Sequence, residues 1–309
     1  MIRTHAAWHG SLSRAGLILA ALAAAPTLAA AQSITATQTY SLGSGPPITV
    51  SDGPSATSAD VAPSATDGSN DSVFGHTYGA AGGALGSRSS GAGIFGITGT
   101  ADFTSVFTNT TGVPVDLQVS FVIDAGQLQV TLPSPSSGVE SASLSALLTS
   151  NGNTLFDYES SMTAFDPTLT PAFDESGLVL NAAGATLSPG DGSYGWTATT
   201  DVADAGILLP GQSDTIEYTL TSAASGTAAA TPCLVLAASI GSGGCGNPNA
   251  IGRIGDPVSA AGPALSFAAL PVSEPPSALL LLVALTGLAV RRHAAASRHA
   301  QKFVSRTLS

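Results

Sequence analysis

The central part of this 309-residue chain has almost no positive charge. Seven of its nine basic residues lie near the two ends, so residues 32–273 hold Arg88 and Arg253 against nineteen acidic residues. A surface of this charge repels phosphate backbones, which argues against a nucleic-acid partner. With two arginines and no lysine there, we also expect no cluster of basic side chains that binds phosphate or carboxylate.

Aromatic residues are scarce as well, at 6% of the chain, whereas there are 35 glycines and many serines and threonines. This composition disfavours helices and favours short strands joined by turns. Turn signals recur at short intervals between alternating segments, a pattern typical of a sandwich. The expected fold class is all-β, with a single β-sandwich-like ectodomain over residues 32–270 and a core of small side chains.

Catalytic motifs are missing from the sequence. His76 is the only histidine of the central part, and the chain has no Gly-x-Ser-x-Gly, His-Glu-x-x-His, P-loop or Cys-x-x-Cys pattern. We interpret His76 as a solvated residue at a strand end and expect no enzyme activity. A secreted hydrolase with paired carboxylates is the weakest alternative, because a glycosidase needs only two of them. The candidates are Asp157 with Glu159, and Asp174 with Glu175.

The N-terminal residues 1–31 resemble a secretory signal peptide. Arg3 and Arg14 supply its positive region, residues 15–25 its apolar run, and Ala29-Ala30-Ala31 a small-residue cleavage site before Gln32. Export also accounts for the two cysteines, since disulfides persist outside the cytoplasm. We predict that Cys233 and Cys245 form a structural disulfide.

The clearest strand signal is strict apolar alternation over residues 115–123, which resumes over residues 127–132. We interpret the two segments as a β-hairpin closed by Asp124-Ala125-Gly126. Residues 139–149 fit a strand or a short helix, residues 43–72 fit a long surface loop, and residues 79–93 show no preference. Further strands are predicted at 33–42, 73–78, 98–107, 154–162, 177–180, 194–200, 214–222 and 262–270.

Two binding sites are candidates. Asp67, Asn70 and Asp71 place three oxygen-bearing side chains in one loop, and Ca²⁺ binds ligands of this kind. An Asx-rich turn is the simpler interpretation. No other cofactor is expected. Tyr194 and Trp196 share one strand face, so they form a sugar-stacking platform if exposed and core residues if buried, and burial is favoured for Trp196.

The C-terminal end has three parts: a Pro-rich break at 271–277, an uncharged apolar run at 278–290, and Arg291-Arg292-His293. Thirteen helical residues span about 20 Å against a hydrocarbon core of about 30 Å. We interpret 278–290 as a short transmembrane segment, permanent or transient, with the arginines and the basic tail 294–309 on the cytoplasmic side.

This end resembles the PEP-CTERM sorting signal of Gram-negative bacteria. Val272, Glu274 and Pro275 match its Val-Pro-Glu-Pro motif, with Ser273 in place of the first proline, and the arginine pair Arg291 and Arg292 closes residues 271–293 as in the family. The resemblance implies processing by an exosortase-type membrane protease and a setting of exopolysaccharide or biofilm. The function expected is therefore a structural or adhesive role at the cell surface or in the extracellular matrix, without catalysis. The alternative is a carbohydrate-binding module for an extracellular polysaccharide, using Tyr194 and Trp196.

Overall fold

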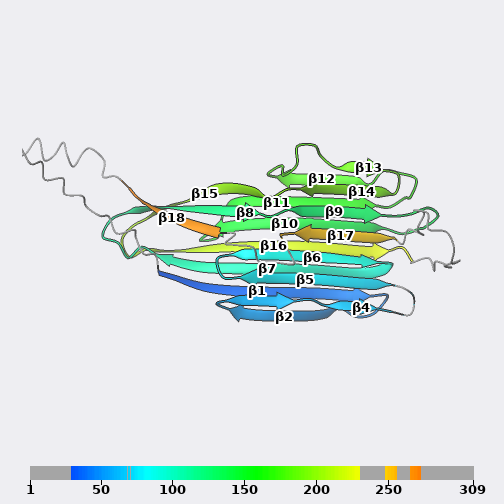
Figure 1. The fold of residues 1–309 in the computed structure, drawn as a ribbon, viewed down its shortest axis with the longest axis horizontal. Coiled ribbons are helices and arrows are strands. Elements are labelled where there is room, and N and C mark those ends of the chain that lie inside the picture. The colour runs from blue at the N-terminus through cyan, green and yellow to red at the C-terminus, as the bar shows by residue number, and fades with distance from the viewer. Residues whose placement is uncertain (1–28, 68, 70, 230–247, 256–264, 273–309) are drawn as a thin grey trace, which may run out of the picture.

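The computed structural model describes residues 29–67, 69, 71–229, 248–255 and 265–272, and every regular element in those ranges is a β-strand. The strands form three sheets in a sandwich-like arrangement (Figure 1). The all-β prediction is therefore confirmed for the described part of the chain.

The first layer is a seven-stranded antiparallel sheet. In spatial order its strands are β12 (Ala172–Gly177), β11 (Asn153–Ala164), β10 (Glu140–Ser150), β16 (Ser213–Thr227), β7 (Ile94–Thr108), β1 (Ala29–Leu42) and β2 (Ile48–Ser55). The segment that fitted either a strand or a short helix is the strand β10. Strand β1 starts three residues before Gln32, so cleavage there would leave most of it in place.

The second layer contains the other two sheets. The eight-stranded sheet runs β13 (Thr186–Ser188), β14 (Asp191–Trp196), β9 (Gly126–Thr131), β17 (Asn249–Ile254), β6 (Ala84–Ala92), β5 (Ser72–Ala80) and β3 (Ser58–Val61), with β4 (Ser64–Thr66) also paired to β5. The three-stranded sheet runs β15 (Thr199–Leu208), β8 (Val115–Ile123) and β18 (Leu265–Pro271).

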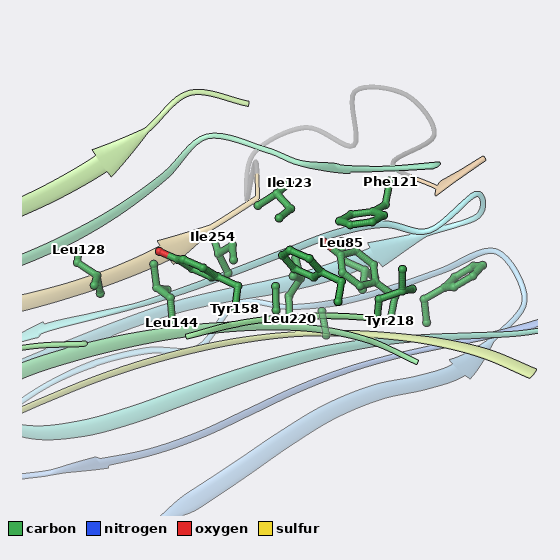
Figure 2. Packing of buried hydrophobic residues seen from close by; sticks show 14 of the residues in the cluster. Leu85, Phe121, Ile123, Leu128, Leu144, Tyr158, Tyr218, Leu220 and Ile254 are labelled. Carbon is green, nitrogen blue, oxygen red and sulfur yellow. The ribbon is translucent and has the colours of Figure 1, made fainter. Parts of the chain in front are cut away.

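The core lies between the layers because the strands alternate buried and half-exposed side chains, as in β8 and β16. The ring of Phe121 on β8 packs 4.9 Å from that of Phe156 on β11 and 6.5 Å from that of Tyr218 on β16, centroid to centroid. Figure 2 shows Phe121 and Tyr218 reaching toward one another from ribbons on the two sides of the core. The apolar stripe that the sequence predicted over residues 115–123 thus faces the core.

The predicted hairpin between residues 115–123 and 127–132 is wrong. Strand β8 pairs with β15 and β18, whereas β9 pairs with β14 and β17. The ladder keeps one register across the break, since Ile123 pairs with Thr199 and Gly126 with Trp196. Asp124-Ala125 is therefore a bend in one long strand. A turn-like tripeptide between two alternating segments does not distinguish a bend from a hairpin.

Several weakly patterned segments are strands, which the sequence did not predict. Residues 43–72 contain β2, β3 and β4, and residues 79–93 contain all of β6. Glycine is needed in β6 because a Cβ on Gly91 would lie 2.3 Å from the Phe95 ring, and one on Gly86 would lie 2.4 Å from the Tyr78 ring. Its small residues make room for the Tyr78 ring on the neighbouring strand β5 and for the Phe95 ring on β7 of the other layer. Conversely, residues 178–180, expected to be a strand, follow the end of β12.

Candidate functional site

Tyr194 and Trp196 belong to the core. Only 2% of Tyr194 and 6% of Trp196 is exposed. The indole Nε1 of Trp196 donates a hydrogen bond to the carbonyl of Asp124 at 2.9 Å, across the bend between β8 and β9, and the Tyr194 hydroxyl donates to Glu175. Burial, followed by the nearby Glu175, raises the pKa of Tyr194 to about 12. Tyr194 and Trp196 therefore do not form an exposed sugar-stacking platform. The burial that the sequence favoured for Trp196 is confirmed.

The edge of this aromatic cluster borders a surface hollow of about 610 Å³. Asn181 crosses its rim, where its side-chain amide donates to the carbonyl of Gly195 at 2.6 Å and its backbone amide donates to the Tyr194 hydroxyl at 3.0 Å. These hydrogen bonds use the polar groups of the hollow to hold the β12–β14 connection in place. The polar side chain of Asn181 at this hollow thus has a structural role.

Of the two predicted carboxylate pairs, one shares a strand face and the other does not. Asp157 and Glu159 share the exposed outer face of β11, as their spacing indicated. Asp174 and Glu175 point to opposite faces of β12, because neighbours on a strand alternate, and Glu175 accepts the hydrogen bond from Tyr194. Instead, Glu159 and Asp174 line one groove of about 250 Å³ with Ser143.

His76 is not at a strand end. It lies within β5, and its Nε2 is 2.9 Å from a carboxylate oxygen of Asp60 on β3. This contact is an edge-strand interaction that is largely open to solvent, because Asp60 is well exposed. His76 thus serves to tie the edge strand β3 to β5.

The Asp67–Asp71 loop is held by its own hydrogen bonds. A carboxylate oxygen of Asp67 accepts from the amides of Ser69 at 2.8 Å and Asp71 at 3.1 Å, while Asp71 accepts from the amide of Ile94 at 3.0 Å. Asn70 lies outside the described residues. Within the described ranges, no group of three or more His, Cys, Asp or Glu side chains is placed to hold a metal ion. The hydrogen bonds of Asp67 match the Asx-turn interpretation.

Other predicted residues lie outside the described ranges: Cys233, Cys245, Glu274, Pro275, Arg291 and Arg292. Val272 is the last described residue, and its amide donates to the carbonyl of Pro114 at 3.1 Å. The described ranges contain no helix long and apolar enough to cross a membrane. The predicted span 278–290 is not among them.

The sequence did not predict the polar surface on the outer face of the first layer. The outer face of the seven-stranded sheet carries serine and threonine at many outward positions of five neighbouring strands, with apolar residues such as Leu147 and Ala223 among them. We call this surface the hydroxyl face; it comprises Thr35, Thr37, Thr39, Thr98, Thr100, Thr104, Ser141, Ser143, Ser145, Ser161, Thr219, Thr221 and Ser225. Repeated Thr-x-Thr and Ser-x-Ser spacings were the signal that would have revealed it.

The register aligns these hydroxyls in rows across the strands. Thr37 pairs with Thr100, Thr100 with Thr221, and Thr221 with Ser145. Neighbouring strands lie about 4.8 Å apart, and alternate residues of one strand about 6.7 Å apart, so the hydroxyls form a two-dimensional array. In the next row a carboxylate of Asp102 accepts hydrogen bonds from Thr219 at 2.8 Å and Thr35 at 3.2 Å, which fixes both side chains.

Comparison of the chain with protein-family models, with curated proteins and with solved structures gives no match.

Proposed function

We propose that this protein is an exported, non-catalytic component of the cell surface or extracellular matrix that adheres to extracellular polysaccharide. The observation that carries the proposal is the hydroxyl face. Each serine or threonine hydroxyl offers one donor and two acceptor sites, as the hydroxyls of a sugar chain do. A repeating array of this kind provides many weak, equivalent hydrogen bonds, which suits a structural polymer better than a small ligand.

The charge of the hydroxyl face supports this role. Its strands carry no lysine or arginine over their described lengths, and its acidic residues Asp102, Asp157, Glu159 and Glu217 are interspersed among hydroxyls. The side chains of Thr37, Thr100 and Thr221 make no hydrogen bond to other described residues, so they are free to bind a ligand. An exposed sheet face needs polar residues for solubility, but it does not need hydroxyls aligned in rows across four strands.

Adhesion can be tested with the exopolysaccharide isolated from the host that makes the protein. We expect the purified full chain to co-sediment with it, and the double variant Thr100→Val/Thr221→Val to be retained less. Valine keeps the β-branch and removes the hydroxyl. The matched control Thr100→Ser/Thr221→Ser keeps both hydroxyls and should bind like the parent. Equal retention of the valine variant, or no retention of the parent, would overturn the proposal.

Delivery to this location is a second part of the proposal. We infer that residues 1–31 are removed on export and that residues 271–293 act as a PEP-CTERM-like signal for an exosortase-type protease. The position of strand β18 supports it, because this strand ends at Pro271, directly before the motif residue Val272. The test is the mass and terminal peptides of the protein recovered from its host. A species that starts at Gln32 and ends near residues 273–277 is expected; an intact 278–309 segment would mean that Ser273 prevents processing.

A further inference from the structure

The two arginines of the central region lie side by side. Arg88 on β6 is the direct cross-strand partner of Arg253 on β17, and their neighbours in the same row are His76 on β5 and Gln127 on β9. We call His76, Arg88, Arg253 and Gln127 the arginine row. It lies on the outer face of the eight-stranded sheet, opposite the face that packs on the core. The sequence did not predict this juxtaposition.

This juxtaposition is unfavourable without a ligand. Directly opposed side chains have Cβ atoms about 5 Å apart, and like charges in that position destabilise a sheet. Burial, followed by the charge of Arg253, lowers the pKa of Arg88. A chain with nineteen acidic residues in this region could place a carboxylate beside them at little cost. In the described ranges neither guanidinium has a carboxylate within salt-bridge distance, and the Nε atom of each is buried without a hydrogen-bond partner.

A groove runs along the adjacent row of the same sheet face. Phe74, Ser90, Ile251 and Gln129 pair in sequence across β5, β6, β17 and β9, two residues from the arginine row on each strand. They line a hollow of about 670 Å³ with Asn249. The Arg88 guanidinium lies 4.9 Å from the centre of the Phe74 ring, which is 41% exposed. The two rows thus combine an apolar ring, amide side chains and two cations.

We propose that this groove and the arginine row bind an acidic polysaccharide whose sugars carry carboxylates. A guanidinium forms paired hydrogen bonds with a carboxylate, and a neighbouring anion would relieve the repulsion between the arginines. The exposed Phe74 ring suits the apolar face of a sugar, and the amides of Gln127 and Gln129 suit its hydroxyls. The polysaccharide part of this inference rests on the proposed function, whereas the preference for anionic sugars rests on the arginines. Nucleic acid is disfavoured by the acidic remainder of the surface.

The test is binding of the full chain to polygalacturonate and to dextran, a neutral polysaccharide, at low and high salt. Binding to polygalacturonate should be tighter, and Arg253→Gln should weaken it about tenfold or more, as for a lost charged hydrogen bond. Arg253→Lys keeps the charge without the paired geometry and should give an intermediate value. Gly112→Ala is the control, because Gly112 lies on neither proposed binding surface and nothing lies within 4 Å of a Cβ at that position. Melting temperatures would show that each variant folds, and Arg253→Gln should melt no lower than the parent because a repulsion is removed.

The possible outcomes distinguish the arginine site from the proposed adhesion to polysaccharide. Equal binding of both polysaccharides, unaffected by Arg253→Gln, would overturn the arginine site and leave the proposed adhesion standing. Binding of galacturonate monomer or of a DNA duplex in preference to polygalacturonate would also overturn it. Binding to none of the polysaccharides, host exopolysaccharide included, would overturn both.

Discussion

The hydroxyl of Ser87 on β6 lies 2.8 Å from the hydroxyl of Ser222 on β16, and this hydrogen bond joins the two layers inside the core. Ser222 also lies 2.9 Å from Ser89, and Ser87 lies 3.1 Å from Thr77, which accepts a hydrogen bond from Gln38 at 2.6 Å. All five side chains are fully buried. The core contains few aromatic rings, and hydrogen bonds between the hydroxyls of its small residues therefore help to hold the two layers together.

Ser222→Ala should lower the free energy of unfolding by about 1–3 kcal/mol, because it leaves the hydroxyls of Ser87 and Ser89 with fewer partners in a buried place. Denaturant unfolding would measure the change. Ser225→Ala is the control, since Ser225 lies on the same strand but is exposed, and it should shift stability by less than about 0.5 kcal/mol. Equal midpoints for the two variants would show that the buried network contributes nothing.

Glu140 is a buried acid at the start of β10. It is fully buried, and neither carboxylate oxygen has a hydrogen-bond partner among the described residues. Burial raises its pKa to about 8. The folded protein thus binds the proton more tightly than the unfolded chain does. The stabilisation is complete below the ordinary glutamate pKa and is lost as the pH rises from there through about 8.

The parent should therefore lose several kcal/mol of stability between about pH 5 and pH 9, at roughly 1.4 kcal/mol per unit of pKa shift. Glu140→Gln should be much less sensitive over this range and more stable than the parent at pH 9. Unfolding midpoints at both pH values would check this. Glu159→Gln removes an exposed acid and should follow the parent. A parent-like pH dependence in Glu140→Gln would mean that another group is responsible.

The sequence predicted strands where apolar residues alternate with polar ones, as in β8, β9 and β16. It failed in two situations. Where the facing rings come from elsewhere, as Phe95 and Tyr78 do at β6, glycine and serine fill the strand and no alternation is visible. Where a strand bends, as at Asp124-Ala125, local residues look like a turn, and only its pairing with β15 and β14 reveals the bend. Pairing across the sheet likewise brings together Arg88 and Arg253, which are far apart along the chain.

The bend between β8 and β9 requires glycine at position 126. A Cβ there would lie 2.0 Å from Cζ2 of the Trp196 indole. We expect Gly126→Ala to displace the ring and to destabilise the fold by about 1–3 kcal/mol. The displacement should alter the emission of Trp196, the only tryptophan after residue 31. Gly112→Ala is the control, because nothing lies within 4 Å of a Cβ at that position. Unchanged emission and stability in Gly126→Ala would show that the indole is not packed against this backbone.

The Asp67–Asp71 loop allows a direct comparison between a turn and a calcium site. The Asp67 carboxylate already accepts two backbone amides, and that of Asp71 accepts the amide of Ile94. We therefore expect millimolar Ca²⁺ to leave the melting temperature unchanged, and Asp67→Ala to lower stability by about 1 kcal/mol with or without calcium. A ligand that binds only the folded state raises the melting temperature with its concentration. A calcium-dependent rise in the parent that disappears in Asp67→Ala would establish a metal site, because a turn held only by its own hydrogen bonds gives no such dependence.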